Sequence, residues 1–118
     1  DFDMLNNIDI HLHVPEGAVK KEGPSAGIAI TTALISALKN KQISSYLALT
    51  GEITLRGNIL PVGKIKEKII GASNNNIKKV ILPKENEKDV EVLDEVIKKN
   101  IKFVYVSNYE EVLKEIKL

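Results

Sequence analysis

The segment KKEGPSAGIAITTALISAL, residues 20–38, places a serine at the start of a long apolar run. Pro24 is a residue favoured in the first turn of a helix, and the apolar residues after it surround most of the helix circumference. We therefore predict a buried central helix over residues 24–40. The Ser25 hydroxyl has two interpretations. It accepts a hydrogen bond as a helix cap, or it is a nucleophile beside N–H groups that stabilise an oxyanion.

The sequence on both sides of this helix predicts an α+β fold in a single domain, residues 1–118. Upstream, residues 8–14 alternate between apolar and polar side chains as in a half-buried strand, and a loop follows over residues 15–24. Downstream we expect strands at 46–55 and 57–62, a helix at 63–74, a strand at 78–83, a helix at 85–99, a strand at 102–106 and a helix at 107–118. The alternation of strand and helix in the last third predicts parallel, helix-covered strands, whereas the first half is more hairpin-like.

Periodicity and spacing also predict details of the last three helices. Their inward-facing residues are expected to be Ile65, Ile69 and Ala72, then Val92, Leu93, Val96 and Ile97, then Tyr109, Val112, Leu113 and Ile116. Ser107 and Glu110 have the spacing of a capping box, so the last helix is expected to begin at Ser107.

Composition excludes several classes of function. A chain of 118 residues with 43% hydrophobic content is sufficient for one core. The 17 basic and 16 acidic residues are spread along the chain, which indicates neither nucleic acid nor an acidic partner. The absence of cysteine excludes disulfides, a thiolate nucleophile and a Cys-based metal site, and fits a reducing setting. No apolar run approaches the roughly 20 residues that span a bilayer, so no membrane partner is expected.

The segment GNILPVGKI, residues 57–65, is similar to a phosphate-binding loop but departs from it in two ways. Five residues separate Gly57 from Gly63 where the P-loop has four, and Ile65 replaces the Ser or Thr that would hold magnesium after Lys64. Nucleotide binding by this chain is therefore not predicted.

A second candidate is a zinc site on the face of the strand at 8–14, where Asp9, His11 and His13 alternate. A closed zinc site needs a fourth ligand, usually Cys or His, and the chain has no other residue of either type. We prefer to interpret these side chains as the polar, solvent-facing side of the strand.

A nucleophilic Ser25 would need a general base, because a serine hydroxyl alone is a poor nucleophile at neutral pH. A His or a Lys that burial keeps uncharged could serve. Lys64 lies with Glu67 on the polar side of its helix, whereas Lys66 and Lys68 both flank the apolar stripe. Periodicity does not choose between Lys66 and Lys68. From the residues alone, a Ser–Lys hydrolase and a domain with a capped helix both remain open.

Three segments together resemble one known family. They are DIHLHVPEGAVKKEGPSAGIAITTALISAL, LTGEITLRGNILPVGKIKEK and IKKVILPKENEKD. In order and spacing they resemble the proteolytic domain of the ATP-dependent Lon proteases, in the bacterial form, from about residue 8 to the end.

The resemblance implies a catalytic site with four residues in named roles. Ser25 matches the nucleophile of the family's P-S-A-G motif, and Lys68 matches the general base. Thr50 matches the Thr of the T-G-E motif, which is expected to orient the Lys amine, and Glu22 stands in the preceding loop, where it would gate access. In the implied chemistry neutral Lys68 takes the Ser25 proton, the alkoxide attacks a peptide carbonyl, and water releases the acyl-enzyme.

The resemblance also sets expectations for the rest of the protein. The chain begins DFDMLNN and is expected to be a piece of a longer protein, with the family's ribosomal-protein-like βα layers but without the N-terminal strands of the domain. ATP and magnesium would belong to an ATPase module outside this chain, so no cofactor is expected here. Expected partners are unfolded or misfolded proteins and other copies in a homohexamer, in the cytoplasm or, alternatively, an organelle matrix.

One departure and one alternative accompany the resemblance. The family's Gly-Gly before the Lys helix is Gly63-Lys64 here, which adds a charged side chain near the site. The alternative function is a non-proteolytic scaffold such as the Lon-like domain of RadA-type DNA repair proteins. Those domains resemble this fold but lack the Ser–Lys pair, whereas this chain has both Ser25 and Lys68 at the matching positions.

Overall fold

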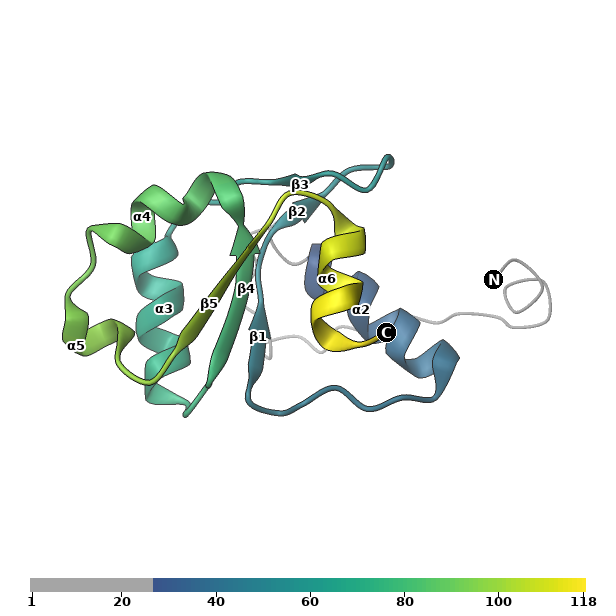
Figure 1. The fold of residues 1–118 in the computed structure, drawn as a ribbon, viewed down its shortest axis with the longest axis horizontal. Coiled ribbons are helices and arrows are strands. Elements are labelled where there is room, and N and C mark those ends of the chain that lie inside the picture. Colours follow the sequence, from purple (N-terminus) through teal and green to yellow (C-terminus); the bar gives the residue numbers. More distant parts are fainter. Residues whose placement is uncertain (1–26) are drawn as a thin grey trace, which may run out of the picture.

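A three-stranded parallel sheet forms the centre of the structure, a computed structural model that describes residues 27–118 (Figure 1). The strands are β1 (Leu47–Leu49), β4 (Lys79–Pro83) and β5 (Lys102–Val106), in the order β1-β4-β5. Ala48 pairs with Val80, and β4 pairs with β5 along its whole length. The parallel strands expected in the last third of the chain are confirmed.

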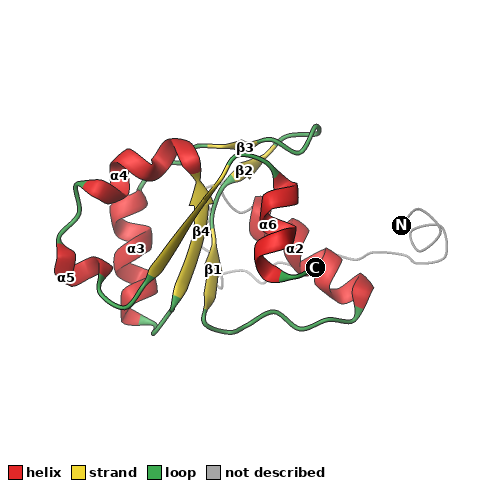
Figure 2. Cartoon of the chain, in the orientation of Figure 1, coloured by secondary structure: helices red, strands yellow, loops and turns green. Residues whose placement is uncertain are grey.

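Helices cover both faces of this sheet, and the described residues form a mixed α+β fold (Figure 2). On one side lie α2 (Gly27–Lys39) and α6 (Tyr109–Ile116). On the other side lie α3 (Ile65–Asn74) and two short helices, α4 (Glu87–Glu91) and α5 (Glu95–Lys98). A single 3-10 turn, η2 (Lys84–Asn86), connects β4 to α4.

Two apolar clusters result from the strand alternation, one on each face of the sheet. Ala48, Val80 and Leu82 pack with Ile65, Ile69 and Ala72 of α3, which confirms the predicted inner face of that helix. The residues between them on the strands point the other way, because successive strand side chains alternate between faces. On that second face lie Leu49, Ile81 and Val106, packed against Ile28 of α2 and against Tyr109 and Val112 of α6.

The predicted strand at 46–55 is wrong as one element, because the chain turns at Gly51. β1 ends at Leu49, and β2 (Glu52–Ile53) instead forms an antiparallel hairpin with β3 (Ile59–Leu60). The cause is the Gly51 backbone, whose φ of 152° is a conformation that side-chain-bearing residues rarely adopt.

The predicted helix at 85–99 is also wrong as one element. The backbone of Asp94 is extended (φ −58°, ψ 140°) and separates α4 from α5, so the two halves do not share one continuous face. Leu93 is buried as expected, whereas Val92 and Val96 are exposed by 82% and 81%, which contradicts their predicted place on the inner side.

Two smaller expectations about the helices also need correction. The part of the central helix that the structure describes is not buried all round, because only one stripe, Ile28 and Thr32, is buried. The capping box lies one residue beyond the prediction: Asn108 caps α6 and pairs reciprocally with Glu111, instead of Ser107 with Glu110. The predicted strand at 8–14 and loop at 15–24 lie outside the described residues.

Candidate active site

Thr50 stands where β1 ends, at the carboxyl edge of the parallel sheet. Its backbone N–H donates to the carbonyl of Ile81, 3.0 Å away, so the chain still follows β4 at this residue. Thr50 is buried, with 8% of its surface exposed. Because side chains alternate along a strand, Thr50 lies on the same face as Ala48, the face that α3 covers. The Thr50 hydroxyl is therefore placed on the α3 side of the sheet.

Lys68 lies in the first turn of α3, on that same side. Its backbone N–H donates to the carbonyl of Lys64, 3.1 Å away, in the bond that starts the helix. The Lys68 side chain is half-buried and its amine is removed from water, whereas Lys64 and Lys66 are exposed. Burial thus separates Lys68 from Lys66, which periodicity had not done. The role of Lys68 as a general base remains a prediction.

The start of α2 reaches the same edge of the sheet. The backbone N–H of Ile28 donates to the carbonyl of Gly51, 3.3 Å away. A Cβ on Gly27 would stand 3.4 Å from Ile53 Cγ2, so the first residue of α2 lies close against β2. Ser25, two residues earlier in the sequence, and Glu22 both lie outside the described residues.

A buried asparagine holds the segment that leads into α3, and sequence reasoning missed it. Asn86 is 3% exposed and follows the carboxyl end of β4. Its side chain accepts from the backbone N–H of Val62 and donates to the Val62 carbonyl, both at 2.9 Å, and it also donates to Asp89. The α3 N-terminus, and with it Lys68, is thereby fixed to the carboxyl edge of the sheet. No local pattern marks Asn86, because its partner is 24 residues away.

On the opposite face a buried tyrosine joins α2 to α6. The Thr32 hydroxyl donates to the Ile28 carbonyl at 2.8 Å and lies 2.7 Å from the Tyr109 hydroxyl. Burial raises the pKa of Tyr109 above its ordinary value, and the hydrogen bond with Thr32 opposes that rise. The backbone N–H of Tyr109 also donates to Gly57 at 2.7 Å, so α6 contacts both α2 and the hairpin. These bonds fix the position of the first turns of α2.

Thr50, the half-buried Lys68 and the start of α2 therefore all lie at the carboxyl edge, where sites of open parallel sheets commonly form. Unpaired N–H groups at a helix N-terminus favour negative charge, and an amine shielded from water at such an edge is a candidate for proton transfer. Among residues 27–118 no group of His, Cys, Asp and Glu side chains could hold a metal ion, and Asp9, His11 and His13 lie outside that range. Within the same range, no helix is long and apolar enough to cross a membrane.

Comparison with known proteins gives consistent matches over almost the whole chain. Residues 1–118 match the family model described as the Lon protease (S16) C-terminal proteolytic domain. A Lon protease of Porphyromonas gingivalis is 53% identical over 113 residues, which is 96% of this chain and 13% of that protein. A Lon protease of Fervidobacterium nodosum is 58% identical over 105 residues, 89% of this chain and 13% of that protein. Lon protease 2 of Borreliella burgdorferi is 54% identical over 112 residues, 95% of this chain and 14% of that protein. The chain thus spans about a seventh of the length of these relatives.

Proposed function

The chain belongs to the Lon protease family, and on this premise we propose that it is a serine endopeptidase domain with a catalytic dyad of Ser25 and Lys68. The observation that carries the proposal is the burial of the Lys68 amine in the first turn of α3, on the face of the sheet where Thr50 lies. A lysine acts as a base only in its uncharged form, so the proposal requires the Lys68 amine to be uncharged during the reaction.

In the proposed reaction the Lys68 amine takes the proton of the Ser25 hydroxyl while the serine oxygen attacks the carbonyl carbon of a peptide bond. The tetrahedral oxyanion is stabilised by backbone N–H groups near the start of α2, whose dipole also favours negative charge there. The Lys68 ammonium then gives its proton to the departing amine, and water hydrolyses the acyl-enzyme in the reverse sequence of proton transfers. Thr50 orients the Lys68 amine, and Glu22 controls access from the preceding loop.

The wider role of the protein follows from the family and forms part of the same proposal. Unfolded or misfolded polypeptides would be delivered by an ATPase module outside this chain, which would also hold ATP and magnesium. We propose that the whole protein is a homohexamer in the cytoplasm, with an organelle matrix as the alternative compartment. The ribosomal-protein-like layering and a role in protein quality control are likewise expected from the family.

The proposal is tested by intact-mass labelling with a serine-directed covalent inhibitor. The wild-type chain is expected to give a single adduct on Ser25, which is lost in Ser25→Ala and in Lys68→Met. Lys66→Met is the matched control, because Lys66 belongs to the same turn but is exposed. This variant should label like the wild type.

Two results would contradict the dyad. Labelling that survives Lys68→Met but not Lys66→Met would transfer the role of base to Lys66. A folded chain without any adduct would show that these 118 residues by themselves do not form a reactive serine. Thermal unfolding of each variant shows whether the chain is folded.

A further inference from the structure

The turn between β2 and β3 forms a protrusion with an apolar and a basic side chain at its end. This hairpin tip, residues 54–58, is closed by hydrogen bonds of 2.9 Å from Thr54 N–H to the Asn58 carbonyl and from Gly57 N–H to the Thr54 carbonyl. Leu55 is fully exposed, and its neighbour Arg56 is the only arginine of the chain. The tip is therefore a well-ordered turn that presents a large apolar side chain to water.

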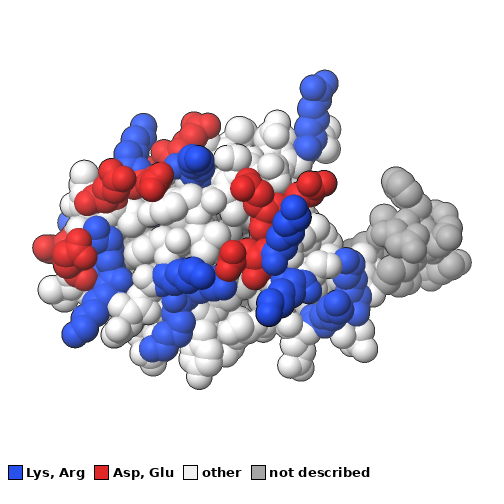
Figure 3. Space-filling model, in the orientation of Figure 1, with Lys and Arg blue, Asp and Glu red and all other residues white. Residues whose placement is uncertain are grey.

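A groove with complementary character lies between α3 and the segment from α4 to α5. This α3–α5 groove has a volume of about 740 Å³, with Leu93 and Ile97 among its apolar lining and Val92 at its rim. Its lining includes four acidic residues against two lysines, which gives it a net negative charge. Figure 3 shows acidic side chains over α4 and α5 with lysines among them, and further lysines towards the amino ends of the strands.

The apolar rim of the groove is unusual for a single chain in water. Val92 and Val96 are more than four-fifths exposed although the amphipathic pattern of the sequence places them with Leu93 and Ile97. Exposed apolar side chains at the edge of a groove can mark a surface that another molecule covers. The amphipathic pattern predicts burial of Val92 and Val96, and a partner that covers them would account for this pattern.

The arrangement of the two features selects the partner. The hairpin tip and α5 lie towards opposite ends of the long axis of the molecule, which measures 48 Å, so a chain cannot insert its own tip into its own groove (Figure 1). A second copy presents the tip in the required form: an exposed leucine for the apolar lining and an arginine for the acidic side chains. A contact between two different surfaces of identical chains repeats head to tail, and it closes into a ring or continues as a filament.

We propose that the hairpin tip of one copy of this chain inserts into the α3–α5 groove of the next copy. The groove includes Lys64, Ile65 and Glu67, so the neighbour's tip lies against the turn of α3 that also carries Lys68. A neighbouring copy thereby stabilises the helix start on which the proposed base depends. This inference rests on the homo-oligomeric assembly proposed above and adds the two surfaces that form it.

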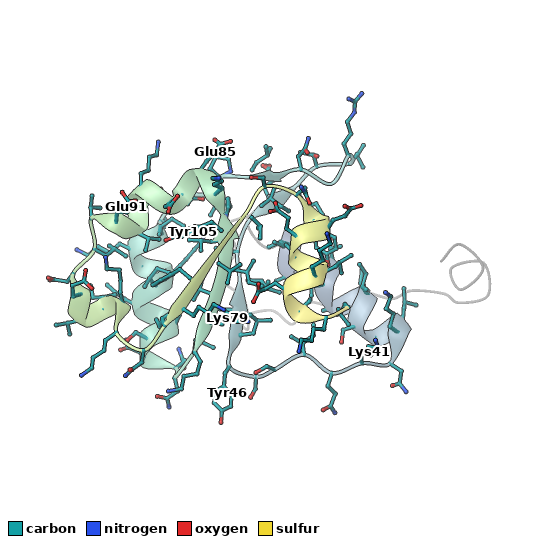
Figure 4. All side chains as sticks on the ribbon, viewed as in Figure 1. Lys41, Tyr46, Lys79, Glu85, Glu91 and Tyr105 are labelled. Carbon is teal, nitrogen blue, oxygen red and sulfur yellow. The ribbon has the colours of Figure 1, made fainter. Side chains whose placement is uncertain are left out.

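Disulfide cross-linking tests the contact directly, because the chain has no cysteine of its own. The variant with Leu55→Cys and Val96→Cys carries one thiol on the tip and one beside the groove, so oxidation is expected to give a ladder of disulfide-linked multimers. The matched control pairs Leu55→Cys with Tyr46→Cys, because Tyr46 is 56% exposed at the amino end of β1, away from α4 and Glu91 (Figure 4). The yield of multimers should be several-fold higher for the tip–groove pair than for this control.

Charge and activity provide two further arms. Arg56→Glu in the tip–groove variant should reduce the yield several-fold, and added salt should reduce the yield of the unmodified pair, since exposed charges are screened. All samples carry Ser25→Ala, so cross-linking is measured without peptidase activity. A negative cross-linking result would therefore contradict the contact between copies but not the Ser25–Lys68 dyad, which the labelling experiment tests separately. Thermal unfolding confirms that each variant is folded, as expected for substitutions at exposed positions.

Either of two results would overturn the proposal. Equal yields for the tip–groove pair and the Tyr46 control would show random collision. Dimers from Leu55→Cys alone or Val96→Cys alone, at the yield of the combined variant, would show a symmetric contact between like surfaces in place of the head-to-tail one.

Discussion

Glycine at position 64 is expected to stabilise the fold more than alanine at that position, although alanine is usually the better residue in and near a helix. Lys64 precedes α3 with a left-handed backbone (φ 57°, ψ 40°), which costs a residue with a side chain roughly 1–2 kcal/mol. Glycine removes this strain but loses about 0.4–1 kcal/mol through the larger freedom of the unfolded chain. The net gain of Lys64→Gly over Lys64→Ala is therefore about 1 kcal/mol in the free energy of unfolding, from these two opposing effects.

The same pair of substitutions at Lys66 should give the opposite sign. Lys66 is exposed in the right-handed first turn of α3, where glycine is about 1 kcal/mol less favourable than alanine. Comparing glycine with alanine at each position removes the contribution of the lost lysine side chain, so only the backbone preference remains.

The assay is thermal unfolding of the four variants, with urea unfolding as a second measurement. A difference of 1 kcal/mol in a domain of this size shifts the midpoint by about 4 °C. Lys64→Gly should melt above Lys64→Ala by about this amount, and Lys66→Gly below Lys66→Ala. If alanine is the more stable residue at both positions, the left-handed backbone at Lys64 is refuted, and with it the reason for a glycine at that place in the family.

Two further predictions concern α6. Asn108→Ala should lower the free energy of unfolding by about 1 kcal/mol, as loss of a helix cap does. Ser107→Ala should lower it less, because alanine retains the backbone N–H that donates to Glu111. Equal losses for the two variants in urea unfolding would contradict the assignment of Asn108 as the cap. The hydrogen bond from Lys79 lowers the pKa of Glu115, so its ion pair stabilises the fold above the unfolded-state pKa and is lost as pH falls through the folded-state pKa. Glu115→Gln should therefore unfold more easily than the wild type at pH 7, by no more than about 1 kcal/mol for a pair that water still partly reaches. A difference that persisted unchanged at pH 2 would exclude this cause.

The elements that sequence predicts well are those with strong local patterns. α3, β4, β5 and α6 occur where the sequence places them, because the two helices each have one clear apolar face and the two strands are short, mostly apolar runs. The capping box shows the limit of such patterns. Ser107 and Asn108 are both followed by a glutamate three residues later, so both have the spacing of a capping box. Local spacing does not decide which of the two residues is the cap. The choice depends on the hairpin, since the Ile59 N–H donates to the Ser107 carbonyl and Asn58 pairs with Asn108, whose backbone is extended as a cap residue requires.

For the proposed site, contacts that are distant in the sequence separate two lysines that local patterns leave equal. Ser25, Glu22, Thr50 and Lys68 came from the resemblance, and the sequence alone left Lys66 beside Lys68 as an equal candidate. Helical spacing gives the two lysines equivalent positions at the edges of one stripe. Their burial differs only because β1 and β4 lie beneath one side of α3, and a helical projection does not contain that neighbour.

Gly51 shows how one residue of the T-G-E motif connects the fold to the chemistry. Its φ of 152° lets the chain leave β1 and enter β2, and a Cβ there would stand 3.0 Å from Ile59 Cγ2 and 3.4 Å from Pro83 Cγ. Any side chain would push apart the hairpin and the end of β4, and the carbonyl of Gly51 also accepts from the start of α2. The residue directly before this turn is Thr50. Backbone geometry therefore requires a glycine at position 51, and a substitution there should disturb the proposed dyad through the start of α2 while leaving every proposed catalytic side chain in the sequence.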